Sequence, residues 1–92
     1  MSDKEFYSRF LKNLKLSQKW PGNYMFKFII KHKETNKDEI QKLFEGMNPI
    51  FSIKKSSKNN FISLSIRLKM DNPESVIKIY KEASKFKGVI AL

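Results

Sequence analysis

Residues 54–60 concentrate groups that could bind an anion. Three lysines and two serine hydroxyls lie within these seven positions, and a tight turn here would also expose backbone N–H groups. A simpler interpretation stays open, because Ser and Asn are also the residues that form turns most readily. The candidate ligand- or partner-binding residues of this segment are Lys54, Ser56, Ser57, Lys58 and Asn60.

The groups that most enzymes need are scarce. Cysteine is absent and His32 is the single histidine, so neither a thiol nucleophile nor a histidine metal cluster can be built. The carboxylates lie mostly at expected helix starts, where they complement the helix dipole, and none pairs with another at a spacing typical of a catalytic dyad. The sequence also lacks a Gly-x-Ser-x-Gly segment. We therefore predict a protein that is not an enzyme and has no cofactor and no metal site.

The net charge indicates a second class of partner. Lys and Arg number 19 and Asp and Glu 9, which gives a formal charge of +10, and such a charge attracts nucleic acid, acidic protein or anionic membrane. Only Arg9 and Arg67 are arginines, and lysine lacks the bidentate fork that reads guanine or clamps phosphate. Codon bias offers another explanation, because Lys, Asn, Ile and Phe, which all have A/T-rich codons, make up 42 of the 92 residues. Weak binding of RNA or DNA is thus an alternative function.

Hydrophobic periodicity places these groups on helices and strands. Spacings of three and four residues predict helices, whereas strict alternation predicts strands. The expected elements are a helix over 3–15, a strand over 24–31, a helix that follows Asn36 and buries a stripe up to Met47, strands over 50–55 and 61–70, a helix from 73 that Gly88 closes, and a strand over 89–92.

From residue 24 onward the order is β-α-β-β-α-β. This order is typical of the ferredoxin-like plait, an α+β fold in which a four-stranded antiparallel sheet carries two helices on one face. Residues 1–19 would add a helical extension to one domain that spans residues 1–92. The apolar stripe of this first helix, Phe6, Phe10 and Leu14, would cover the open face or an edge of the sheet, or else a partner.

The third expected strand, residues 61–70, offers a second candidate surface. Ser63, Ser65 and Arg67 alternate with apolar residues and would face outward. Plait domains that bind RNA stack bases on exposed strand aromatics, but Tyr24, Phe26 and Phe28 fall on the expected core side. We therefore add Ser63, Ser65 and Arg67 to the candidate binding residues and expect nucleic-acid binding to be weak.

The hairpin over residues 52–65 resembles the signature hairpin of the YbeD-like family of small bacterial proteins. Ser56, Ser57, Lys58 and Asn60 match its Ser-Ser-Lys-Gly-Asn-Tyr pattern, and the alternate serines that follow are also in step. The resemblance covers about residues 20–92 and departs from the pattern at Asn59 and Phe61, which stand in place of Gly and Tyr. It implies a ferredoxin-like fold similar to amino-acid-binding regulatory domains, in a family whose activity is not established.

These observations favour a non-catalytic regulatory or protein-interaction module. The resemblance implies a bacterial protein. No segment has the 18 or so apolar residues that span a bilayer, and the first residues are too polar for a signal peptide, so we expect a cytoplasmic protein that does not bind membranes. The expected partner is another protein or a second copy of the chain.

Overall fold

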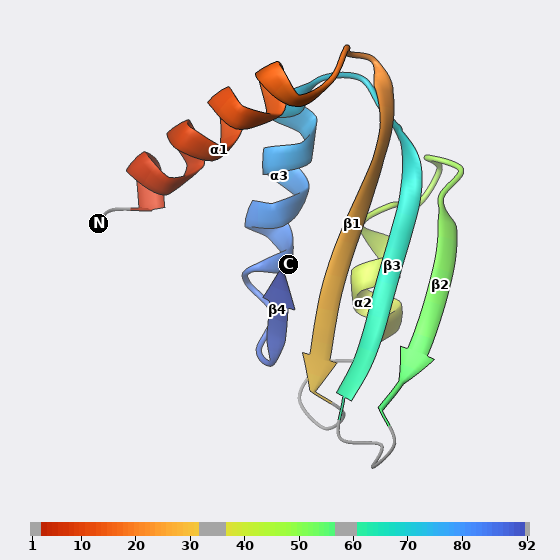
Figure 1. The fold of residues 1–92 in the computed structure, drawn as a ribbon. Coiled ribbons are helices and arrows are strands. Elements are labelled where there is room, and N and C mark those ends of the chain that lie inside the picture. Colours follow the sequence, from red (N-terminus) through yellow and green to blue (C-terminus); the bar gives the residue numbers. More distant parts are fainter. Residues whose placement is uncertain (1–2, 32–36, 57–60, 92) are drawn as a thin grey trace.

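The computed structural model describes residues 3–31, 37–56 and 61–91, which form an α+β fold with one sheet (Figure 1). The elements in chain order are α1 (Asp3–Ser17), β1 (Gly22–Lys31), α2 (Lys37–Lys42), β2 (Ile50–Lys55), β3 (Phe61–Met70), α3 (Pro73–Ala83) and β4 (Val89–Ala91). None of the helices in these described ranges is long and apolar enough to cross a membrane.

The sheet has the strand order β2-β3-β1-β4, and every neighbouring pair is antiparallel. The two central strands pair along their whole length, from Gly22 opposite Met70 to Lys31 opposite Phe61. β4 is much shorter and pairs with Phe28, Ile29 and Ile30 only. The first half of β1 therefore extends beyond β4, as Figure 1 shows.

Strict alternation along β1 and β3 gives the sheet one apolar face, as predicted. Phe26 and Phe28 on β1 and Leu64 and Ile66 on β3 are completely buried. Phe44, which follows α2, and Tyr80 of α3 cover them: the Phe26 ring centroid lies 5.0 Å from that of Phe44 and 5.1 Å from that of Tyr80. Burying each such side chain contributes about 1.5–3 kcal/mol, so this face holds most of the stability of the fold.

Helix α3 begins where the sequence predicts. The N–H of Ser75 donates to Oδ1 of Asn72 at 2.8 Å, and Pro73 occupies the first turn, where its missing N–H costs nothing. The stripe predicted to be buried, Val76, Ile79, Tyr80 and Ala83, lies in the core. The helix ends at Ala83, however, and Gly88 does not close it. Gly88 instead turns the chain into β4 with φ 73°, and its carbonyl accepts the N–H of Lys31 at 2.9 Å.

Helix α2 is shorter than its apolar stripe indicates. Its described part ends at Lys42, and the N–H groups of Leu43, Phe44 and Glu45 then donate to carbonyls three residues earlier. These tighter turns still bring Phe44 into the core, whereas Met47 stays partly exposed. Gly46 and Asn48 adopt positive φ values of 79° and 55°, a conformation that these residue types tolerate best. Asn36, the predicted cap, lies outside the described residues.

Helix α1 packs on α3 and does not cover the open face of the sheet (Figure 1). Leu14 is buried, and its carbonyl accepts the indole N–H of Trp20 at 2.9 Å. The Phe10 ring lies 5.2 Å from that of Tyr80. Phe6, one turn further out, is 56% exposed. The predicted stripe therefore divides: its second half packs on the domain and its first residue remains accessible.

Candidate functional site

The sheet face opposite α2 and α3 carries the main candidate site, which we call the outer sheet face. On β1 and β3 its members are the side chains that alternate with the buried residues, and on β2 and β4 they are the residues that pair with those members in the strand register. They are Met25, Lys27, Ile29 and Lys31 on β1, Ile50, Ser52 and Lys54 on β2, Phe61, Ser63, Ser65, Arg67 and Lys69 on β3, and Ile90 on β4.

The strand register brings four of the predicted candidates together. Lys54 pairs with Ser63, and Ser65 lies two positions further along β3. Arg67 stands between Ile50 of β2 and Met25 of β1. Neighbouring strands lie about 4.8 Å apart, so these side chains form one continuous patch.

The charges of the outer sheet face all have one sign. Its cations are Lys27, Lys31, Lys54, Arg67 and Lys69, and its described members include no carboxylate. Like charges gathered on one surface produce a summed positive potential that attracts anionic groups, an effect that weakens as salt increases. The half-buried hydroxyls of Ser63 and Ser65 lie among them and can donate hydrogen bonds.

The hairpin tip is described only in part. The N–H of Ser56 donates to the Phe61 carbonyl at 3.0 Å, and the N–H of Phe61 donates to the Ser56 hydroxyl at 3.2 Å. Ser56 therefore closes the hairpin, which agrees with the simpler interpretation of this serine as a turn residue. Ser57, Lys58 and Asn60 lie outside the described residues.

Aromatic rings are rare on the outer sheet face. Phe61 is 42% exposed at one end of β3, whereas Phe26 and Phe28 are buried on the other face. Phe26 and Phe28 thus lie on the core side of the sheet, where the alternation placed them. Apolar side chains nevertheless contribute, because Met25, Ile50 and Ile90 are all exposed. The sequence alternation identifies Met25, but only the strand order adds Ile50 and Ile90.

The hydroxyl groups of Tyr24 and Tyr80 lie 3.1 Å apart and join β1 to α3. Burial and, to a smaller extent, the hydrogen bond and charge interaction with Tyr24 raise the pKa of Tyr80 far above its ordinary value. Tyr80 therefore keeps its proton and cannot act as a base near neutral pH. Within the described ranges, His, Asp and Glu side chains do not gather in threes that could hold a metal ion.

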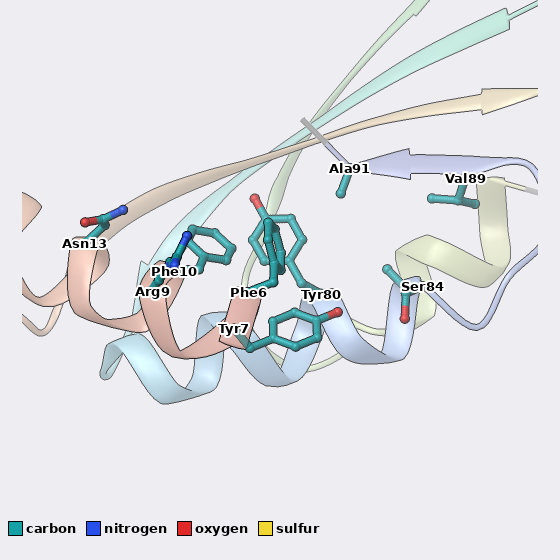
Figure 2. A pocket seen from close by; sticks show the side chains of 10 residues that line it. Phe6, Tyr7, Arg9, Phe10, Asn13, Tyr80, Ser84, Val89 and Ala91 are labelled. Carbon is teal, nitrogen blue, oxygen red and sulfur yellow. The ribbon is translucent and has the colours of Figure 1, made fainter. Parts of the chain in front are cut away.

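A separate hollow of about 440 Å³ lies between α1, α3 and β4. Figure 2 shows Phe6 and Phe10 on one wall and Ala91 and Val89 on the other, with Tyr80 between them. The apolar stripe of the first helix indicated an apolar surface at this place. The sequence could not show that β4 and α3 form the opposite wall of the hollow.

Comparison with known proteins covers most of the chain. Residues 16–92 match the model of a family described as "Protein of unknown function (DUF493)". A "UPF0250 protein" of Shewanella piezotolerans (strain WP3 / JCM 13877) is 27% identical over 73 residues, which cover 76% of this chain and 83% of that relative. No solved structure matches the chain significantly.

Proposed function

The chain belongs to the DUF493 family, which is also the UPF0250 or YbeD-like family, and from this premise we propose a cytoplasmic, non-catalytic regulatory module that binds an acidic protein through its outer sheet face. The observation that carries the proposal is the composition of that face. Five cations and several exposed apolar side chains share it, and its described members include no acid.

The proposed fold is the ferredoxin-like plait. The order β2-β3-β1-β4 supports it, together with α2 and α3 as the connections between strands of one antiparallel sheet. In this arrangement both helices cover one face, so the other face is available along the full length of β1 and β3.

An acidic protein suits the outer sheet face better than the other partners considered. Protein interfaces combine an apolar centre with a polar rim, and Met25, Ile29 and Ile90 supply apolar surface beside Lys27. Face-to-face pairing with a second copy would bring two positive surfaces together, which costs energy. RNA or DNA binding stays the second candidate because the same cations favour it, although without aromatic stacking it would be weak and sensitive to salt.

The test compares two variants with equal charge changes. Lys27→Glu/Arg67→Glu alters the outer sheet face, whereas Lys15→Glu/Lys78→Glu alters exposed positions on α1 and α3. Crosslinked pull-down from bacterial lysate should recover a protein with the wild type and with the α1/α3 variant, but not with the outer-face variant. The purified partner should bind the outer-face variant at least tenfold more weakly. Recovery of the same proteins with both variants would contradict the proposal.

The nucleic-acid alternative has its own measurement. The protein is titrated with single-stranded RNA and with duplex DNA at about 50 mM salt, because low salt favours electrostatic binding. If affinity is measurable, falls steeply with added salt and is lost in Lys27→Glu/Arg67→Glu, then the ligand of the outer sheet face is a polyanion and not an acidic protein. Undetectable affinity at low salt would eliminate this alternative.

A further inference from the structure

The first half of β1 has a free edge on the side of β4. Lys31 donates its N–H to Gly88 across this edge, and backbone groups alternate in direction along a strand. The N–H and C=O of Met25 therefore point to the same side, where none of the described residues pairs with them. At the start of the strand, the Asn23 carbonyl on this side accepts a hydrogen bond from the Gln18 side chain at 3.0 Å, so the free edge begins after Asn23.

An apolar hollow lies beside the end of β4, the strand next to which this free edge starts. It lies where β4 ends at Ala91, and Phe6, Phe10 and Tyr80 line it (Figure 2). A strand that continued the direction of β4 along β1 would place alternate side chains on the helix side of the sheet, opposite Tyr24 and Phe26. Apolar side chains at those positions would enter the hollow and cover the exposed ring of Phe6.

The other side of the same edge is positively charged. Lys27 lies on it, and Arg67 and Lys69 pair with Met25 and Asn23 from the neighbouring strand. Side chains of an added strand that faced this side would stand beside these cations. The described residues that line the hollow also include no Asp or Glu. An acidic added strand would therefore meet no described negative charge beside the hollow.

We propose that an extended acidic segment of the partner protein adds to β1 as a fifth strand, antiparallel to β1 and in line with β4. Its backbone pairs with Met25, its apolar side chains fill the hollow, and the acidic side chains between them face Lys27, Arg67 and Lys69. This inference rests on the proposed function and names its binding mode, strand addition at a sheet edge. A second copy of the chain is a poor occupant, because its net charge of +10 repels the same cations.

The probe is the peptide fluorescein-Glu-Val-Glu-Phe-Glu-Ile-Glu-amide, labelled at its N-terminus, with a control in which lysine replaces each glutamate. Fluorescence anisotropy should show binding of the acidic peptide and a loss of at least tenfold for the lysine peptide. Met25→Pro removes the N–H at the free edge, a position where a strand tolerates proline, and should weaken binding at least tenfold. Met25→Ala keeps that N–H and removes only the side chain, so it should weaken binding clearly less than Met25→Pro does.

Two further measurements do not depend on whether Met25→Pro folds. Phe6→Glu changes an exposed side chain at the rim of the hollow and should weaken acidic-peptide binding about fivefold, as expected for a lost apolar contact of about 1 kcal/mol. In the wild type, amide hydrogen exchange of Met25 should slow when the peptide binds. Unchanged exchange at Met25, or protection confined to β2, would overturn the proposal.

The two proposals can fail separately. If Met25→Pro and Met25→Ala bind the acidic peptide equally, strand addition is wrong. If Lys27→Glu/Arg67→Glu still abolishes recovery of the cellular partner, the proposed function stands. If Lys27→Glu/Arg67→Glu still recovers the cellular partner and Met25→Pro does not, the partner binds the free edge of β1 and not the outer sheet face.

Discussion

The two faces of the sheet are built from the same strands but differ in burial and in charge. On β3, Leu64, Ile66 and Leu68 are buried under the helices, and the alternating Ser65, Arg67 and Lys69 face outward. The inner side depends on close packing, in which the loss of a few methylene groups costs stability. The outer side carries charged and accessible side chains, and these residues can change with little effect on folding.

The largest expected difference between the faces lies between two adjacent residues of β1. Phe26→Ala removes a completely buried ring that contacts Phe28, Phe44 and Tyr80 and should lower the free energy of unfolding by about 3–5 kcal/mol. Lys27→Ala should change it by less than about 0.5 kcal/mol. Urea unfolding monitored by circular dichroism measures the free energy of unfolding of both variants. Similar losses for the two would show that the two faces contribute equally to stability.

A smaller effect is expected at the hydroxyl pair on the inner side. Tyr80→Phe keeps the ring and removes the hydrogen bond to Tyr24, which should cost about 1 kcal/mol at neutral pH.

The same variant should change the response to alkali. Burial and the Tyr24 interaction raise the pKa of Tyr80 in the folded protein, so the folded state holds this proton more tightly than the unfolded state does. The protonated Tyr80 hydroxyl therefore contributes its full stabilisation of the folded state below about pH 10, the ordinary pKa of tyrosine. This contribution is lost as the pH rises above that value. Thermal unfolding between pH 8 and 11 should show a steeper loss for the wild type than for Tyr80→Phe, and parallel curves would contradict the assignment.

The smallest effect is expected at the centre of the outer sheet face. Ser65→Val places a β-branched residue, which strands favour, at a half-buried outward position. The free energy of unfolding should rise or stay level within about 0.5 kcal/mol, while affinity for the proposed acidic partner should fall because a hydroxyl among the cations is lost. A loss of more than about 1 kcal/mol in chemical denaturation would show that this face also supports the fold.

Local signals in the sequence identified much of this structure. Alternation along β3 predicted its bounds at Phe61 and Met70, and the Asn72-Pro73 cap predicted the start of α3, because both depend on residues near one another in the chain. The end of α3 and the role of Gly88 were predicted wrongly. The backbone hydrogen bond between the Lys31 N–H and the Gly88 carbonyl joins distant parts of the sequence, and no local pattern reports it.

The candidate site shows the same division between local and distant information. Alternation predicted that Ser63, Ser65 and Arg67 face outward. Only strand pairing showed that Lys54 and Ile50 stand beside them and that β1 has a free edge. The hollow is formed by α1 together with α3 and β4, which lie at the other end of the sequence, so no single pattern could reveal it.

The exposed strand β2 bears on the tendency of this protein to aggregate at high concentration. Ile50, Phe51 and Ile53 are all accessible on a strand at the border of the sheet, and such a strand can template aggregation of one molecule onto the next. Lys54 and Lys55 end the same strand, and their charges oppose that growth as long as salt does not screen them. Besides the net charge of +10, two lysines at one border of the sheet would thus contribute to the colloidal stability of the protein.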